Sequence, residues 1–128
     1  MKQIKQIVVF KATPEEVYDA VVDAKKHSKF SQSKATNNAK VGGKFTAYDN
    51  YISGENLKLE KGKKIVQKWT STDFPKGHYT EVVFEFKKQG DGTKLIFTQN
   101  NVPDENYADI KKGWIEFYWK PMKVTFGW

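Results

Sequence analysis

The sequence contains no cysteine and no arginine, and each absence excludes a class of function. Without cysteine there is no disulfide, no thiolate nucleophile and no cysteine-ligated zinc or iron–sulfur centre. All 22 basic residues are therefore lysines. Because arginine supplies the planar fork that recognises guanine or phosphate through two parallel hydrogen bonds, a basic protein without it is a poor candidate for sequence-specific nucleic-acid binding.

Long apolar runs are also missing. No stretch approaches the ~20 apolar residues that a membrane-spanning helix needs, and the segment 1–6 lacks the apolar core and small-residue cleavage site of a secretory signal. We therefore expect a cytoplasmic protein. Its 128 residues are enough for one domain, residues 1–128, whose core needs no disulfide or metal.

Aromatic residues and positive charge are abundant by contrast. The chain has nine Phe, six Tyr and four Trp, and a net charge of +7. Because each aromatic side chain can bury about 150–250 Å², the core or a cavity must be largely aromatic. The charge favours solubility, and it permits salt-sensitive attraction to an acidic partner.

The N-terminal third predicts one strand followed by two short helices. Residues 4–11 alternate as a strand does. The run Thr13-Pro14-Glu15-Glu16 has the pattern of a capping box, with Thr13 as N-cap and Glu16 reaching back to its amide. Asp23 can cap a second helix over residues 24–30.

The middle of the chain predicts only strands and turns. Thr80, Val82, Phe84 and Phe86 share one face of the most regular strand, which indicates a sheet with one buried side. Short turn sequences separate the strands and predict an antiparallel meander. The expected strands are 33–39, 43–49, 51–60, 64–71, 78–88 and 93–100.

A long helix is predicted after Pro103, with Asp104 as its cap. Its apolar positions repeat every three or four residues, which indicates one buried face. These positions are Tyr107, Ile110, Trp114, Phe117, Pro121 and Val124. Pro121 should kink the last turns, and the aromatic ending at residues 126–128 predicts a docked C-terminus.

Together these elements predict an α+β helix-grip fold, with order β-α-α-β-β-β-β-β-β-α. A sheet that is polar on one face needs a cover on the other, and only the C-terminal helix is long enough to provide it. We therefore expect a curved antiparallel sheet wrapped around that helix.

Ordered motifs along nearly the whole chain resemble one family. They are Phe10 with Thr13-Pro14-Glu15-Glu16-Val17-Tyr18, Gly42-Gly43-Lys44-Phe45, Ile52-Ser53-Gly54, Ile65-Val66-Gln67-Lys68-Trp69, Gly77-His78, Gly113-Trp114 and Lys123-Val124-Thr125-Phe126-Gly127. This set is similar to the C-terminal domain of the activator of the heat-shock protein 90 ATPase, within the START-like (SRPBCC) superfamily. The resemblance implies a cytoplasmic, stress-response co-chaperone that contacts the chaperone's ATPase domains. The eukaryotic activator carries a further N-terminal domain that docks on the chaperone's middle domain.

No pattern in the chain indicates catalysis. Only His27 and His78 are present, 51 positions apart in the sequence, and no carboxylate motif accompanies them at metal-ligand spacing. We interpret both as surface or turn residues. No carboxylate pair suggests acid–base work. We predict a protein that is not an enzyme and that has no cofactor, metal or catalytic residue.

Two groups of residues are candidates for binding. The first would line a cavity between helix and sheet, although a filled core is the favoured interpretation; it comprises Phe45, Trp69, Phe84, Phe97, Trp114, Phe117 and Tyr118. The second would form a partner-facing patch, although an ordinary solvated surface is favoured; it comprises Lys58, Lys61, Lys63, Lys64, Lys111 and Lys112.

The leading functional hypothesis is a co-chaperone that acts on a heat-shock protein 90 type chaperone through its surface. The alternative is binding or transport of a small hydrophobic ligand in the helix-grip cavity. A lyase or cyclase of the START-like kind lacks visible chemistry in this sequence.

Overall fold

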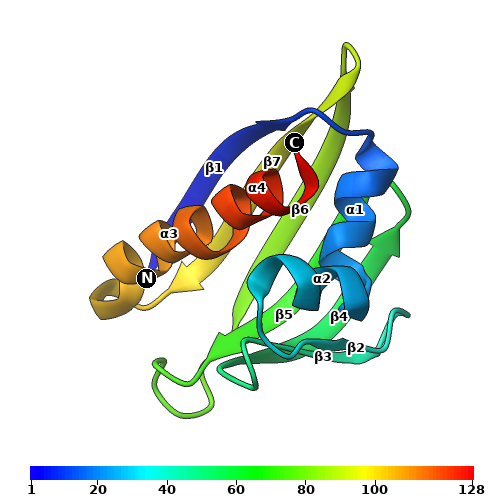
Figure 1. Cartoon of the computed structure of the whole chain (residues 1–128). Coiled ribbons are helices and arrows are strands. Elements are labelled where there is room, and N and C mark those ends of the chain that lie inside the picture. Colours follow the sequence, from blue (N-terminus) through cyan, green and yellow to red (C-terminus); the bar gives the residue numbers. More distant parts are fainter.

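The computed structural model describes residues 1–128 and contains one antiparallel sheet of seven strands in the order β1-β7-β6-β5-β4-β3-β2. The sheet curves around the C-terminal helix (Figure 1), so the predicted helix-grip fold is confirmed. The strands are β1 (Lys2–Phe10), β2 (Thr36–Asn37), β3 (Lys44–Ala47), β4 (Ile52–Glu60), β5 (Lys64–Ser71), β6 (Thr80–Gln89) and β7 (Gly92–Val102).

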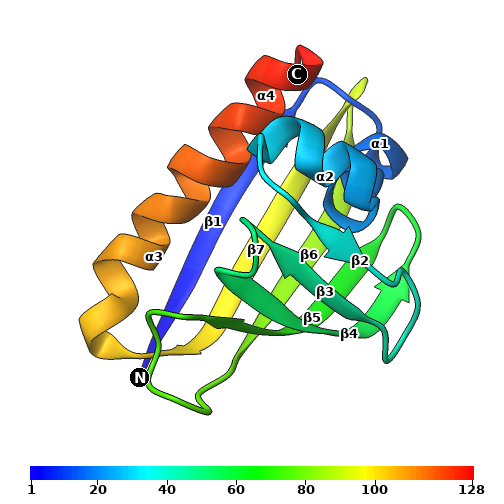
Figure 2. The same ribbon diagram turned by 60° about the horizontal axis from the view of Figure 1, so that its bottom comes forward.

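Helices α1 (Pro14–Val22) and α2 (Ala24–Ser31) follow β1, as the capping signals predict. The Glu16 amide donates to the Thr13 hydroxyl at 3.2 Å, and the Thr13 amide donates to the Glu16 carboxylate at 3.1 Å. The Lys26 amide donates to the Asp23 carboxylate at 3.0 Å and begins α2. Figure 2 shows α2 between the C-terminal helix and the short strands β2 and β3.

The C-terminal helix is built from four consecutive pieces. They are the 3₁₀ turn η1 (Asp104–Asn106), α3 (Tyr107–Trp114), the π-helical segment η2 (Ile115–Trp119) and α4 (Lys120–Phe126). None of the helices in the chain has both the length and the apolar character that crossing a bilayer requires.

The buried face of β6 is the one that the sequence predicts. Thr80, Val82, Phe84 and Phe86 are buried, while Glu81 is exposed. Phe84 pairs across the sheet with Phe97 of β7, and their rings lie 5.1 Å apart. These side chains belong to one cluster of 26 buried residues between the sheet and the helices.

The predicted buried face of the C-terminal helix is correct only as far as Trp114. Phe117 is 58% exposed and Val124 is 84% exposed, whereas Tyr118 and Met122 are buried in their place. The reason is η2, because a π turn holds one residue more than an α turn and rotates everything after it around the helix axis.

Two details at the ends of this helix also differ from expectation. Asp104 makes no capping hydrogen bond, and its carboxylate instead pairs with the amino group of Met1 at 3.3 Å. The irregularity expected at Pro121 takes the form of the π segment in front of it. Since Pro121 has no N–H for the carbonyl of Phe117, that carbonyl accepts a hydrogen bond from the Tyr48 hydroxyl instead.

The C-terminus is docked, as its aromatic composition predicts. The carbonyl of Trp128 accepts from the Lys11 amide at 3.1 Å. The Trp128 ring lies 6.1 Å from Phe10, edge to face, and 4.7 Å from Phe126. The end of the chain therefore closes the core beside the end of β1.

Candidate functional site: an aromatic cavity beside the C-terminal helix

A cavity of about 400 Å³ lies between the C-terminal helix and the β3–β5 side of the sheet. Its helix wall comes from α3 and η2, and its sheet wall comes from β4, β5 and the β3–β4 turn. It is lined by Tyr48, Tyr51, Ile52, Trp69, Asp109, Ile110, Gly113, Trp114, Phe117 and Tyr118.

The structure brings together four of the seven candidate cavity residues: Trp69, Trp114, Phe117 and Tyr118. Phe45 and Phe84 instead border a neighbouring space of about 10 Å³, which is in effect filled core. Phe97 is fully buried under Trp114, with 4.3 Å between the ring centroids, and borders neither space.

Sequence reasoning missed the residues that the β3–β4 turn brings to the cavity. Tyr48 and Tyr51 flank the turn pair Asp49-Asn50, and a tyrosine on each side of a turn is the signal that could have indicated an aromatic wall. Gly113 also borders the cavity from the helix side, and a Cβ at this position would meet nothing closer than Phe117 at 3.8 Å.

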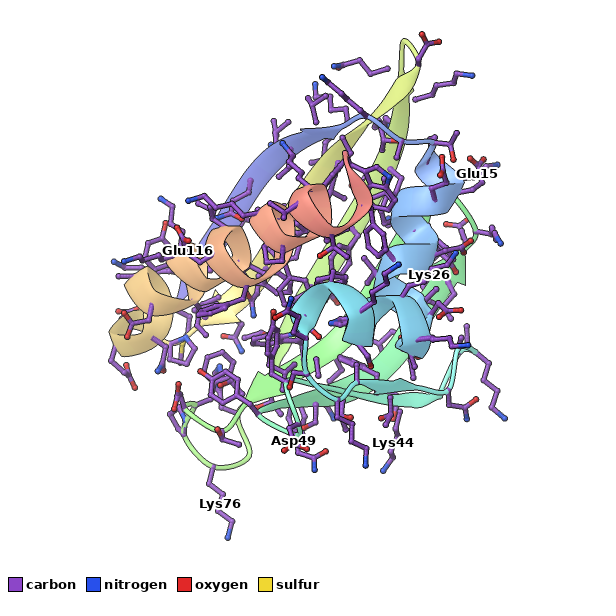
Figure 3. All side chains as sticks on the ribbon, viewed as in Figure 1. Glu15, Lys26, Lys44, Asp49, Lys76 and Glu116 are labelled. Atoms are coloured by element: carbon purple, nitrogen blue, oxygen red, sulfur yellow. The ribbon has the colours of Figure 1, made fainter.

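The β3–β4 turn has an unusual backbone. Tyr48, Asp49 and Asn50 have φ angles of 50°, 54° and 74°, so three successive residues other than glycine occupy the left-handed region. This conformation costs roughly 1–2 kcal/mol per residue and persists only where its surroundings hold it. The Asp49 amide donates to the Lys34 carbonyl at 3.0 Å, and the Tyr48 hydroxyl donates to the Phe117 carbonyl. Figure 3 shows the turn, with Asp49 labelled, below the C-terminal helix.

The cavity wall is electrically neutral at physiological pH except at one point. Burial raises the pKa of Tyr48 to about 12. Burial, with the neighbouring Tyr48 second, raises the pKa of Tyr118 far above its usual value of 10. Burial and a hydrogen bond to Asp73 raise the pKa of Tyr51. Asp109 is the one ionised side chain in the lining, and it is exposed.

The polar atoms of the aromatic residues fall into two groups. The indole N–H of Trp114 donates to the Gln99 side-chain carbonyl at 2.7 Å, and that of Trp119 donates to Gln6 at 2.7 Å. The indole N–H of Trp69 and the hydroxyl of Tyr118 have no protein partner, although these side chains are only 3% and 4% exposed. Neither atom is among those sealed from solvent, and both side chains line the cavity.

His27 is not at the surface, which corrects the sequence interpretation. It is 8% exposed, its ring stacks on Phe30 at 4.7 Å, and Tyr118 lies edge-on at 5.3 Å. Its Nδ1 lies 3.0 Å from the Val21 carbonyl and must be the protonated nitrogen, because a carbonyl only accepts. Its Nε2 is buried without a partner. Burial lowers the pKa of His27.

The two histidines lie on different parts of the fold, and a ring nitrogen of each contacts a backbone carbonyl. The Nε2 of His78, just before β6, lies 2.8 Å from the carbonyl of Asn101, whereas His27 lies on α2. No three side chains of His, Asp or Glu gather closely enough to hold a metal ion.

The six candidate lysines form two separate groups. The hairpin lysines Lys58, Lys61, Lys63 and Lys64 surround the β4–β5 turn beside α1, where Lys61 pairs with Asp19 at 3.3 Å and Lys58 with Glu60 at 3.5 Å. The helix lysines Lys111 and Lys112 lie on α3, whose Lys111 carbonyl accepts from Gln6 of β1. Three strands of the sheet separate β1 from β4 and its turn.

Comparison with known proteins agrees with this architecture. Residues 11–127 match the family model described as "Activator of Hsp90 ATPase homolog 1-like protein". The chain belongs to this family.

Curated members of the family are longer than this chain. The human "Activator of 90 kDa heat shock protein ATPase homolog 1" is 31% identical over 119 residues, which is 93% of this chain and 35% of the human protein. A Dictyostelium discoideum homologue is 31% identical over 128 residues, which is 99% of this chain and 33% of that protein. The chain therefore spans about a third of the length of these curated relatives.

A solved structure of similar extent also matches. "PFC0360w, an HSP90 activator from plasmodium falciparum" has a TM-score of 0.92 and 30% sequence identity, with 99% of this chain and 97% of that chain covered. The Aha1 dimer from Colwellia psychrerythraea has a TM-score of 0.83 at 19% identity, over 98% of this chain and 96% of that chain, and shares the fold of the activator family.

Proposed function

We propose that this member of the activator family is a co-chaperone that binds the ATPase domains of a heat-shock protein 90 type chaperone in the cytoplasm. The observation that carries the proposal is the match to the Plasmodium falciparum protein, which is called an HSP90 activator. The present chain covers 97% of that solved chain, so the name was given to a chain of nearly the same length as this one.

The side-chain chemistry supports action by binding. One histidine is buried against Phe30 and the other is bonded to a backbone carbonyl. No cluster of ligands for a metal is present. A protein of this kind changes its partner's activity by binding one conformation of the partner more tightly than another. The shift between the two conformations is limited by that difference in affinity.

The net charge of +7 favours an acidic surface on the partner, and the hairpin lysines, four in number against two on α3, are the larger group that could meet it. Within this group Lys63 and Lys64 form no ion pair, whereas Lys58 and Lys61 are paired with carboxylates. Lys63 is therefore free to pair with a partner, together with the partly exposed Lys64.

Titration into the heat-shock protein 90 chaperone of the same cell tests the proposal. Binding heat and ATPase rate are followed at roughly 50 and 200 mM salt, a range over which screening of surface charges becomes strong. We expect binding that weakens as salt rises, with a change in ATPase rate. Absence of binding at both salt concentrations would refute the co-chaperone function.

Two variants of equal charge locate the contact. The first variant combines Lys63→Glu with Lys64→Glu, and the second combines Lys111→Glu with Lys112→Glu. Each reverses two charges and lowers the net charge from +7 to +3. We expect the first pair to weaken chaperone binding much more than the second. Equal weakening would show that only overall charge matters, and the opposite order would place the contact on α3.

A further inference from the structure

We propose that the aromatic cavity is a binding site for a small, flat, neutral molecule that carries one hydrogen-bond acceptor, such as an aromatic ketone or amide. This binding is separate from the contact with a chaperone, since the hairpin lysines do not line the cavity.

The size and walls of the cavity suit a flat apolar ligand. Its volume of about 400 Å³ falls within the range of about 300–1,000 Å³ that is usual for small-molecule sites. Trp69 and Trp114 lie 5.4 Å apart with their planes 36° from parallel, and with Phe117 they give aromatic surface on both walls. Aromatic surfaces of this kind favour offset or edge-on contact with another ring.

Two donors on residues of the cavity lining select for an acceptor. Trp69 and Tyr118 both line the cavity, and the Trp69 N–H and the Tyr118 hydroxyl have no protein partner. A pure hydrocarbon would displace water from these groups and leave them unpaired, which is unfavourable. A carbonyl oxygen can accept from either group while the rest of the ligand stays in the apolar part.

The charge of the lining selects against anions. No lysine borders the cavity, although the chain contains 22. The ionised group present is the carboxylate of Asp109. A carboxylate or sulfonate on the ligand would lose its hydration without gaining a cationic partner and would be repelled by Asp109. Fatty acids are therefore disfavoured as ligands.

The strained β3–β4 turn shows that this space is held open. Tyr48 of the turn bonds to the carbonyl of Phe117 on η2, so one hydrogen bond joins the two walls. Left-handed residues in succession cost free energy and cluster at ligand sites, where they preorganise a wall. The cavity is therefore formed before a ligand arrives.

Three ligands that share one ring system test the proposal: 2-acetonaphthone, naphthalene and 2-naphthoate. We expect 2-acetonaphthone to bind one-to-one with a Kd on the order of 100 µM, given its small size. Naphthalene should bind about 2- to 10-fold more weakly, because it lacks the acceptor. The anion 2-naphthoate should bind more weakly than either.

The indole N–H signals of the uniformly ¹⁵N-labelled protein show where the ligand lies. The chain has four tryptophans, and Trp69→Phe identifies the signal of Trp69. We expect 2-acetonaphthone to shift the Trp69 signal downfield, while the N–H groups of Trp114 and Trp119, which are already bonded, move less. Naphthalene should not produce the downfield shift.

Gly113 provides a matched pair of variants that remain folded. Its Cβ position meets nothing closer than 3.8 Å, so a leucine at this position would occupy the cavity while improving the helix. We expect Gly113→Leu to abolish binding of 2-acetonaphthone and Gly113→Ala to retain most of it. Both variants should unfold at a higher temperature than the parent protein.

Two further variants separate the polar contributions. Tyr118→Phe should weaken the binding of 2-acetonaphthone by up to about 10-fold and leave the binding of naphthalene unchanged. Asp109→Asn should strengthen the binding of 2-naphthoate alone. The proposal is overturned if none of the ligands binds up to millimolar concentration, if 2-naphthoate binds as well as 2-acetonaphthone, or if Gly113→Leu binds as the parent does.

Discussion

The C-terminal helix covers two parts of the sheet in different ways. The part over β1, β7 and β6 is the filled half. There the ring centroid of Phe97 lies 4.3 Å from that of Trp114 and 5.3 Å from that of Trp119, and the N–H of each indole is hydrogen-bonded. Over β3, β4 and β5, the open half, there is a cavity of about 400 Å³ and an indole N–H with no partner.

This difference indicates a division of labour within one interface. The filled half has close-packed rings and satisfied polar atoms, and these are the features that stabilise a small domain. The open half gives up packing and keeps donors available, and these are the features that a binding site needs. Paired substitutions, one in each half, measure how far stability and binding are separated.

The largest expected difference is between Phe97→Ala and Phe117→Ala. Phe97 is fully buried in the filled half, so its loss should lower the free energy of unfolding by about 3–5 kcal/mol. Phe117 is 58% exposed beside the open half, so its loss should cost less than about 1 kcal/mol. Urea denaturation monitored by circular dichroism measures both values. Equal losses would contradict the division.

A smaller difference concerns hydrogen bonds. Gln99→Leu removes the acceptor of the Trp114 N–H and the donor to the Thr80 hydroxyl, and leaves both groups buried. We expect a loss of about 1–3 kcal/mol in the free energy of unfolding. Tyr118→Phe removes a hydroxyl without a protein partner and should change stability much less. The same denaturation series compares them, and a larger effect for Tyr118→Phe would show that its hydroxyl is bonded after all.

Substitution of glycine should distinguish open space from close packing. Gly113→Ala in the helix wall of the cavity should raise the free energy of unfolding by about 0.5–1 kcal/mol, because alanine is the better helix former. Gly54→Ala in β4 is the control, since its Cβ would lie 1.9 Å from the Lys68 carbonyl oxygen and should destabilise the protein. Thermal unfolding of both variants tests the contrast.

The smallest effect is confined to mild acid and concerns His27 of α2, which packs against Tyr118 of the C-terminal helix. Burial lowers its pKa in the folded state below the usual value of about 6.5, so the unfolded chain binds the proton more readily. Stability should therefore fall as the pH drops through 6.5 towards the folded-state pKa, and stay constant above that range. His27→Asn keeps a donor for Val21 and does not titrate.

Melting temperatures between pH 7.5 and pH 5 measure this dependence, because most carboxylates stay ionised over that interval. The parent protein should lose more stability than His27→Asn. Parallel curves for the two proteins would show that His27 is already accessible to protons in the folded state.

Where local rules determine the structure, the sequence was sufficient to predict it. The capping box at Thr13–Glu16 depends on four adjacent residues, and the alternation at Thr80–Phe86 depends on the two-residue period of a strand. Both features are present in the structure as expected. The aromatic end at Trp128 also docks, because large apolar rings are rarely left in water.

Three features that depend on particular distant contacts were not predicted. His27 stands among lysines in the sequence, but its ring turns inward to Phe30 of its own helix and Tyr118 of the C-terminal helix. Asp104 meets the amino group of Met1, which no local pattern reveals. The two walls of the cavity are joined by a bond from Tyr48 to Phe117, 69 positions further along the chain, and the sequence shows neither partner of that bond.

The π-helical segment η2 also has a consequence for how the length of this chain can vary. Between Ile115 and Trp119 the helix holds one residue more than its axis requires, and Phe117 within it is largely exposed. Loss of one residue there would give an uninterrupted α-helix in which Ile110, Trp114, Trp119 and Met122 recur at ordinary α-helical intervals on a single face. The same loss one turn earlier would leave the extra residue of η2 in place and would rotate Ile110 relative to Trp114 and Trp119. Natural length variation within this helix is thus expected to concentrate at residues 115–119.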